Sequence, residues 1–514
     1  MRKQFGSLKV MSLKKNIIFN YIGRFYIVLI SILILPLYFK YLGAAAFGLI
    51  GIYALMQSWF SIFNLGLTAA LSREVAYCYS HENGFLKIKQ LLRSLEIIFL
   101  LIIFMIAIGI MLSSHWIAYH WLKIENLNYH EVSYCIVLMG LSICFRFFAD
   151  LYRAGISGIE QQVWLNVASI FLSTAQYGGG YILLRWITKI PSHFFEYQLL
   201  ISAIEPILLG VKFYKILPVF SGRLSRITIS WKSIGKIFPF ASSIFYTGTI
   251  WILLSQSDKL ILSHILSLTI FGYFALVSII SSGILQCAMP ISLALLPRMT
   301  QLLSQGKTTE MLQLYRHATQ MVSVIVFSIA GIIATFGAQI VYTWTGDKLA
   351  ADWSGPILFW YALGNGFLSI TAFQYYLQFA HGNLKLHVVF NTVFALFAIP
   401  LIFFSAYHYG AKGTAITWFV MQCVSFIVWP PIVHRRYAPN LHRQWILKDI
   451  LPIFGGTLIT IFFIKKIPFN FTSMSREQDL GILIILGVFA IMTNMVASST
   501  CRDFIVARFL KKLN

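Results

Sequence analysis

The chain alternates long apolar runs with short polar connections. A membrane-spanning helix needs about 20 mostly apolar residues, and runs of this length recur along the whole sequence. No connection on the outer side is long enough to form a folded domain. We therefore predict an all-α, polytopic membrane protein with about fourteen transmembrane helices, at 17–39, 47–71, 91–112, 132–153, 163–187, 194–216, 237–257, 268–292, 319–342, 357–379, 386–407, 411–433, 447–465 and 480–498.

Several of these predicted spans carry small or polar residues on one face. Residues three or four positions apart lie on the same side of a helix, although Ile27 interrupts the pattern in the first span. Single residues of this kind usually join one membrane helix to another. Their recurrence indicates a partly polar interior. The stripes are Asn20, Gly23, Arg24 and Ser31; Gln57, Ser61, Asn64 and Thr68; Ser142, Arg146 and Asp150; Asn166, Ser169 and Ser173; and Gln198, Ser202 and Glu205.

Composition and charge support this assignment and orient the chain. With 58% hydrophobic and 11% charged residues and a mean hydropathy of +0.76, the protein is too apolar for an ordinary water-soluble globule. If the N-terminus lies inside, most of the 40 lysines and arginines fall on the inner side, as cytoplasmic loops require. We predict that both termini are cytoplasmic. The net charge of +23 then reflects topology and indicates no nucleic-acid partner.

The N-terminus has one alternative interpretation. Basic residues, an apolar run and the segment Ala44–Ala46 could form a cleavable signal peptide. The apolar run is longer than such a peptide uses, and Arg24 interrupts it. We therefore expect a membrane span.

Two arginines lie inside predicted spans, Arg24 in the first and Arg146 in the fourth. A charge at the centre of a membrane helix costs about 2.5–3.5 kcal/mol. Arg24 could extend to the cytoplasmic interface, and Arg146 could be neutralised by Asp150 one turn away. Both arginines fall in the cytoplasmic half, however, and guanidinium binds phosphate through paired hydrogen bonds. We predict that both bind an anionic substrate, with further contacts from Asn20, Ser31, Gln57 and Asn64.

Four other charged residues are candidates for gating or ion coupling. Asp150 and Glu205 belong to the polar stripes, whereas Asp258 and Lys259 lie in the segment SQSDKL near the end of the seventh span. Asp258 and Lys259 could also be an ordinary ion pair at the membrane interface. The sequence does not identify a coupling ion.

No cofactor, metal or catalytic site is predicted. The six cysteines form no CxxC pair and no cluster with the twelve histidines. The sequence contains no Walker lysine motif, GxSxG or HExxH. ATP-driven transport and standard hydrolysis therefore have no support, and we do not expect an enzyme.

The predicted spans divide into two lobes and an appendix. The basic connection 217–236 separates the sixth and seventh spans, which predicts an N-lobe at 1–220, a C-lobe at 221–445 and a pair of helices with a tail at 446–514. A faint repeat supports two lobes, because AAFGLIGIYALM at 45–56 is echoed by TIFGYFALVSII at 269–280. Such a repeat would relate the lobes by an axis along the membrane normal.

The order of several short motifs resembles the polysaccharide transporters that include the O-antigen flippases. The motifs are Asn20-x-x-Gly23, Pro36, Leu42-Gly43, Phe47-Gly48 and Leu65-Gly66-Leu67 in the first two spans, and SQSDKLILSHILSLTIFGYFALVSII at 255–280.

This resemblance implies a MATE-like fold of two six-helix lobes plus two helices, in the bacterial inner membrane. It implies that a polyprenyl-diphosphate-linked oligosaccharide, assembled on the cytoplasmic face, is flipped outward by alternating access, possible partners being membrane lipids and other polysaccharide assembly proteins. The diphosphate would then be the target of Arg24 and Arg146. The scarcity of arginine in the second lobe departs from the cationic interior of the family.

Two other functions compete with this one. A polysaccharide polymerase or ligase would also span the membrane many times, but such enzymes carry a large outer loop and this chain has none. A cation-coupled multidrug antiporter of the same superfamily would need an acidic, aromatic cavity, whereas this interior is basic. A purely structural role would leave Arg24 without a reason.

Overall fold

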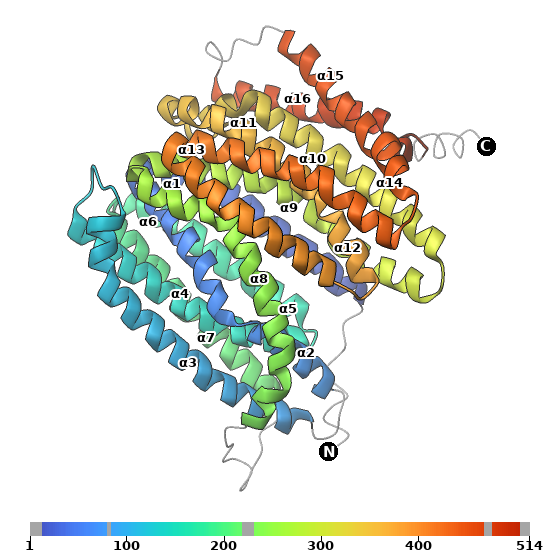
Figure 1. Cartoon of the computed structure of the whole chain (residues 1–514). Helices are drawn as coiled ribbons and strands as arrows, with labels where there is room; N and C mark the ends of the chain where they lie inside the picture. Colours follow the sequence, from blue (N-terminus) through green and yellow to red (C-terminus); the bar gives the residue numbers. More distant parts are fainter. Residues whose placement is uncertain (1–12, 80–83, 218–230, 467–474, 504–514) are drawn as a thin grey trace. The chain divides into compact units, whose positions relative to one another are not determined.

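The computed structural model describes residues 13–79, 84–217, 231–466 and 475–503 (Figure 1). These residues form helices and no β-sheet, as the apolar runs predict. In a bilayer, helices satisfy every backbone polar group within the segment. Ten of them are long and apolar enough to cross a membrane by length and composition. Every predicted span lies on helical segments, but the number fourteen stays a prediction.

The chain consists of two compact units, a first unit, Met1–Gly272, and a second unit, Tyr273–Asn514. The predicted division into 1–220, 221–445 and 446–514 is a different partition, and its first boundary lies outside the described residues. It stays a prediction.

The helices of the first unit are α1 (Leu13–Phe60), α2 (Leu67–Tyr79), α3 (Gly84–Trp116), α4 (Tyr129–Gly158), α5 (Gln162–Ser173), α6 (Gly180–Trp186), α7 (Pro191–Ile216) and α8 (Trp231–Ile265), with the short turns η2 (Ser61–Asn64), η3 (Ile117–Trp121) and η4 (Thr174–Gly179).

Helix α9 (Leu268–Ser304) begins in the first unit and continues into the second. The second unit also contains α10 (Thr308–Thr345), α11 (Lys348–Thr371), α12 (Phe373–Ala380), α13 (Lys385–Tyr437), α14 (Leu441–Gln444), η6 (Trp445–Ile450), α15 (Leu451–Lys466) and α16 (Arg476–Ala497).

Two glycines divide the longest helices into pairs of spans. Gly43 has φ 80° inside α1, and Gly410 has φ 59° inside α13. Left-handed backbone of this kind favours glycine, which has no Cβ. The first and second predicted spans meet at Gly43, and the eleventh and twelfth meet at Gly410.

The second predicted span is not one continuous helix, which corrects that expectation. After η2 the chain passes through Leu65 and Gly66, both at positive φ, before α2 begins. A Cβ on Gly66 would collide with the carbonyl oxygen of Ala241 in α8. The Leu-Gly-Leu motif therefore marks a sharp break where two helices approach closely.

The fifth predicted span is also irregular, because the π-helical turn η4 lies between α5 and α6. Its carbonyl groups accept hydrogen bonds from tyrosines of neighbouring helices. Tyr38 donates to the carbonyls of Gln176 and Tyr177 at 3.1 and 2.8 Å, and Tyr197 donates to that of Ala175 at 2.6 Å. These bonds satisfy backbone groups and tie α1 and α7 to the turn.

The two sequence repeats meet at a pair of glycines. A Cβ on Gly48 would collide with the carbonyl oxygen of Leu268, and a Cβ on Gly272 would collide with that of Ala44. The contact is reciprocal, because each glycine lies at the same position of its own repeat. Small residues at a crossing allow membrane helices to pack backbone to backbone.

A set of contacts that we call the clasp joins residues 121–123 to residues 263–268 of the first unit. Trp121 Nε1 donates to Ser263 Oγ at 3.0 Å, and Lys123 Nζ donates to the Ile265 carbonyl at 2.8 Å. The backbone N–H of Leu268 donates to the Lys123 carbonyl at 2.8 Å. The clasp therefore connects the α3–α4 loop to the α8–α9 loop.

In the second unit, α15 and α16 pack against α10 (Figure 1). Asn494 Nδ2 donates to Ser328 Oγ at 2.8 Å and to Thr457 Oγ1 at 2.7 Å. At the other end, Arg476 donates to the carbonyls of Thr343 and Trp344 at the end of α10. These two predicted final spans are thus packed onto the second unit.

Candidate functional site

The polar stripes of α4, α5 and α7 meet inside the first unit. Helices α4 and α7 pack along much of their length, and their polar residues recur at helical spacing. Arg146 Nε on α4 donates to Ser202 Oγ on α7 at 3.2 Å. The structure therefore joins two stripes that the sequence predicts separately.

Arg153 contacts three of these helices, although the sequence analysis did not single it out. Its Nη2 donates to Glu205 on α7, its Nη1 donates to Ser169 Oγ on α5 at 3.3 Å, and its Nε lies 3.4 Å from Asp150 Oδ1. Asp150 thus pairs with Arg153, one turn away, and not with Arg146. The signal was present in the sequence, because Arg146 and Arg153 are seven residues apart and share a helix face.

Arg146 forms no ion pair with a carboxylate among the described residues. Its side chain is half-buried, and its guanidinium lies 5.8 Å from the centre of the Tyr53 ring. An aromatic face and a hydroxyl stabilise a cation only modestly. Arg146 is therefore available to an anion that enters this space.

Asn20, Arg24 and Ser31 of α1 lie in three different surroundings. Asn20 Oδ1 accepts a 2.5 Å hydrogen bond from Asn166 Nδ2 on α5, which ties α1 to the stripe of α5. Arg24 is exposed and has no hydrogen-bond or ion-pair partner in the described part of the chain. Ser31 Oγ donates to the Val28 carbonyl of its own helix at 2.8 Å. No contact joins Arg24 to Arg146 among these residues.

Asn64 has a local structural contact, whereas Gln57 does not. Asn64 Oδ1 accepts from the backbone N–H and the hydroxyl of Thr68 at 3.1 and 3.0 Å, across the break before α2. Gln57 is half-buried and its side chain has no hydrogen-bond partner among the described residues.

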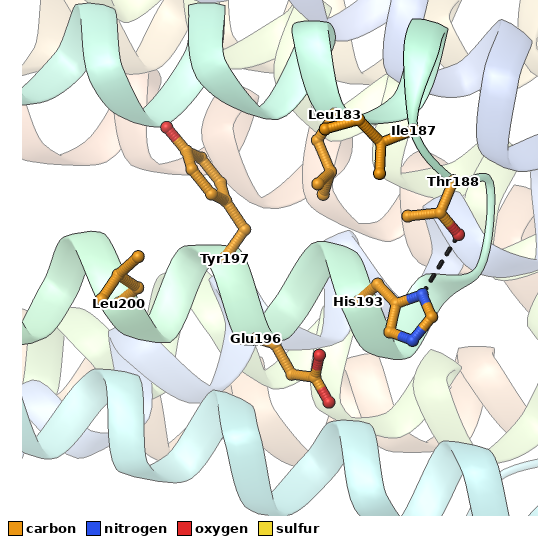
Figure 2. A pocket seen from close by; sticks show the side chains of 7 residues that line it. All are labelled: Leu183, Ile187, Thr188, His193, Glu196, Tyr197 and Leu200. Carbon is orange, nitrogen blue, oxygen red and sulfur yellow. Dashed lines mark hydrogen bonds between the residues drawn. The ribbon is translucent and has the colours of Figure 1, made fainter.

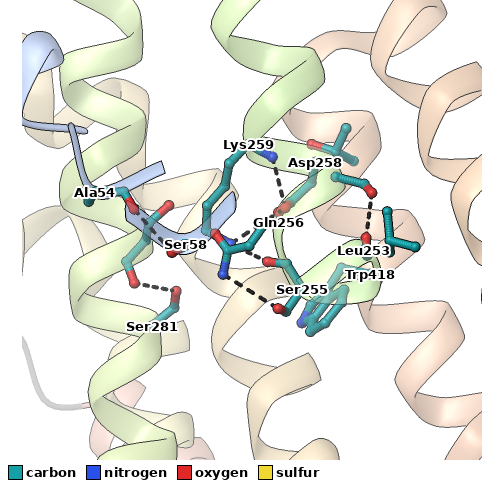
Figure 3. Close-up of polar contacts among 12 residues, drawn as sticks. Ala54, Ser58, Leu253, Ser255, Gln256, Asp258, Lys259, Ser281 and Trp418 are labelled. Carbon is teal, nitrogen blue, oxygen red and sulfur yellow. Dashed lines mark hydrogen bonds and ion pairs between the residues drawn. The ribbon is translucent and has the colours of Figure 1, made fainter. Parts of the chain in front are cut away.

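Asp258 and Lys259 lie together in α8 (Figure 3). Lys259 Nζ is 3.5 Å from Asp258 Oδ1 and donates to the Ser255 carbonyl at 2.6 Å. The carboxylate is buried and the ammonium group is half-buried. The two residues neutralise each other and are not joined to the arginines of α4.

Among Arg24, Arg146, Arg153, Asp150 and Glu205, the arginines outnumber the carboxylates by one. Asp150 and Glu205 both pair with Arg153, so Arg24 and Arg146 keep their charges. We call Arg146, Asp150, Arg153, Ser202 and Glu205 the α4–α7 cluster. Such a cluster inside apolar helices is suited to a phosphate-bearing ligand.

Comparison with known proteins decides the family. The family model described as "Polysaccharide biosynthesis protein" matches residues 13–303, more than half of the chain. This chain belongs to that polysaccharide biosynthesis family. A protein named "Putative O-antigen transporter" from Shigella flexneri is 21% identical over 418 residues, covering 79% of this chain and 94% of the relative.

Solved structures show the fold of this family member. The lipid II flippase MurJ in an inward closed conformation aligns with a TM-score of 0.71 and 17% identity, over 95% of this chain and all of MurJ. An inward-facing multidrug MATE transporter aligns with a TM-score of 0.60 and 11% identity, over 81% of this chain and 96% of its own. The MATE-like fold implied by the sequence motifs is confirmed. The chain is a multi-pass membrane protein whose relatives are transporters.

The first unit also has a hollow of about 550 Å³, where α6 and α7 are connected (Figure 2). His193 Nδ1 and Thr188 Oγ1 form a hydrogen bond of 3.1 Å, and the Glu196 carboxylate accepts one from the Tyr134 hydroxyl at 3.0 Å. No arginine or lysine lines this hollow, so it does not fit an anion. Its lining residues are Leu183, Ile187, Thr188, His193, Glu196, Tyr197 and Leu200.

Metal binding has no candidate site in the described residues. No group of three or more histidine, cysteine, aspartate or glutamate side chains is close enough together to hold an ion there. The prediction that the protein needs no metal is untested by this geometry.

Proposed function

We propose that this protein is a flippase that carries a polyprenyl-diphosphate-linked oligosaccharide from the cytoplasmic to the outer leaflet of the bacterial inner membrane. The observation that carries this proposal is the guanidinium of Arg146, which forms no ion pair among the described residues and lies in a polar cluster between apolar helices. Charge of this kind is costly in a membrane and is retained for function. The names of the relatives, an O-antigen transporter and a lipid II flippase, agree with it.

The proposed binding residues follow from their charge and position. Arg24 and Arg146 bind the diphosphate, because neither forms an ion pair with a carboxylate of the described residues. The amide and hydroxyl groups of Asn20, Ser31, Gln57 and Asn64 contact the sugars. Gln57 is the freest of these, since the others already bond to protein groups.

Gating and ion coupling form a separate part of the proposal. Asp150 and Glu205 exchange ion-pair partners among the arginines during gating. The pair Asp258 and Lys259 contributes to gating or ion coupling in α8. Alternating access further requires one end of the molecule to close while the other opens. We propose that the clasp closes the outer end, with both termini in the cytoplasm.

A multidrug antiporter is the second candidate, because MATE transporters share the fold. Such a protein would bind organic cations. The two unpaired arginines favour anions instead, and transport of a cationic dye by the purified protein would overturn this preference.

The proposal is tested by complementation of a flippase-deficient strain that makes the matching lipid-linked sugar. We expect the parent chain to restore surface polysaccharide and Arg146→Ala to reduce it about tenfold or more, since a charge-assisted hydrogen bond to the diphosphate is lost. Arg146→Lys should recover part of this activity, and Arg24→Ala should lose activity as well. In cells that carry an inactive variant, lipid-linked sugar units should accumulate on the cytoplasmic side.

The matched control is Arg298→Ala, because Arg298 is exposed and, in the described part of the chain, donates a hydrogen bond only to Gln301 of its own helix. It should behave as the parent at equal membrane level. Failure of the parent chain with a matching substrate would reject the flippase function, whereas full activity of Arg146→Ala and Arg24→Ala would reject the anion site.

A further inference from the structure

Arg153 is engaged by side chains from three helices, yet its side chain is partly exposed. Its partners are Asp150, Ser169 and Glu205. The side chains of Arg153 and Asp150 are 39% and 50% exposed, whereas that of Glu205 is 12% exposed. A ligand on the exposed side of this cluster can therefore reach the guanidinium. A salt bridge sealed in the helix packing would not be open in this way.

The two carboxylates occupy the part of Arg153 that a phosphate would use. Carboxylate and phosphate oxygens both accept charge-assisted hydrogen bonds from the donors of a guanidinium. Glu205 contacts Nη2 and Asp150 lies near Nε. The carboxylates therefore satisfy Arg153 in the way that phosphate oxygens would.

Arg146 and Arg153 form a matched pair along α4. They are two helical turns apart, a rise of about 10.5 Å, and their partners Ser202 and Glu205 are one turn apart on α7. A diphosphate presents two phosphoryl groups. The long side chains of Arg146 and Arg153 can approach it from both ends.

We propose that Arg153 is a further diphosphate-binding residue, and that Glu205 and Asp150 hold its guanidinium in the substrate-free protein as substitutes for phosphate oxygens. This inference rests on the proposed flippase function. When the diphosphate arrives, Arg153 exchanges a carboxylate for a phosphoryl oxygen, with no covalent bond made or broken.

The same carboxylates also explain how the substrate leaves. Once Arg153 binds the diphosphate, Glu205 and Asp150 stand near it as like charges, which weakens binding. A transporter must release what it captures, so competition for one guanidinium keeps the binding reversible. Removal of the Glu205 charge should therefore strengthen binding and slow transport.

The first test measures binding of undecaprenyl diphosphate to the full-length purified protein in lipid nanodiscs. We expect Arg153→Gln to weaken binding about tenfold or more. Glu205→Gln should tighten it about threefold or more while lowering surface polysaccharide in the complementation strain. Arg298→Gln serves as the control and should bind as the parent.

The second test exchanges the two charges in one variant, Arg153→Glu with Glu205→Arg. A purely structural ion pair would tolerate this swap, with binding and transport restored. Under our proposal the swap restores membrane level and thermal stability but not diphosphate binding, because the guanidinium then projects from α7. This test remains decisive if Arg153→Gln alone fails to fold.

The outcomes separate the two proposals. If the parent chain binds undecaprenyl diphosphate and complements, but Arg153→Gln binds equally well or the swap regains both activities, only the role of Arg153 is overturned. If the parent neither binds this lipid nor complements, the flippase function and the inference fall together.

Discussion

A charged side chain between apolar helices is stabilised by the groups around it, and different residues of this protein find different partners. Arg316 on α10 is the clearest structural case: its Nε and Nη2 donate to Asp449 at 2.6 and 2.8 Å, and Gln320 also donates to this carboxylate at 2.7 Å. Asp449 is fully buried. Arg146 has no such carboxylate within the described residues, which separates a structural arginine from a candidate binding one.

At this scale we predict that Asp449→Asn destabilises the protein. The substitution leaves the Arg316 charge uncompensated, at a cost of about 3 kcal/mol, the lower end of the usual range because Arg316 is 21% exposed. The measurement is the apparent Tm of the purified protein in detergent, which should fall clearly.

The matched control is Glu310→Gln, which removes the exposed ion pair with Lys307. Glu310→Gln should lower the free energy of unfolding by less than about 1 kcal/mol. Equal Tm values for the two variants would show that the Arg316–Asp449 pair does not stabilise the fold.

Close approach of helices depends on particular glycines at the scale of the element. The crossing at Gly48 and Gly272 brings the backbone of α1 against that of α9, with the Gly48 nitrogen 3.2 Å from where a Cβ on Gly272 would lie. Motif positions that the sequence analysis used for the family resemblance and the internal repeat therefore have a packing role. The reciprocal contact also supports the faint internal repeat.

We predict that Gly272→Ala costs about 1–3 kcal/mol, because the new methyl group must displace the backbone of Ala44. Thermal unfolding and the yield of folded protein measure this effect. Gly283→Ala on the same helix is the control, since nothing lies within 4 Å of its Cβ position. A Gly272→Ala protein as stable as Gly283→Ala would mean that the crossing readily relaxes.

Alternating access concerns the molecule as a whole, because it requires the two ends of the transport path to open in turn. The clasp closes loops of the first unit on each other through Lys123 and the segment 263–268. Its contacts are mostly single hydrogen bonds at the ends of helices and in the adjoining loops. Bonds of this kind can break and re-form at modest cost.

We predict that locking the clasp stops transport. In a variant without the native cysteines that still complements, Lys123→Cys with Ser267→Cys should form a disulfide, because these residues form a β-bridge. Surface polysaccharide should be lost on oxidation and regained on reduction. Either single cysteine variant should remain active under both conditions, and an active oxidised double variant would show that the clasp need not open.

The sequence by itself determined the membrane location, the helical class, the positions of the apolar runs and, through short motifs, the family. These properties follow from composition and local spacing, because a bilayer accepts few structures other than apolar helices. Spacing also placed Arg146, Ser202 and Glu205 on polar faces.

Only the tertiary structure decided which faces meet. It paired Asp150 and Glu205 with Arg153, tied Asn20 to Asn166, interrupted the second and fifth spans, and joined Gly48 to Gly272. The physical reason is that partners such as Arg153 and Glu205 are 52 residues apart in the chain. Helical periodicity orders residues within one helix, whereas contacts between helices depend on how the whole bundle packs.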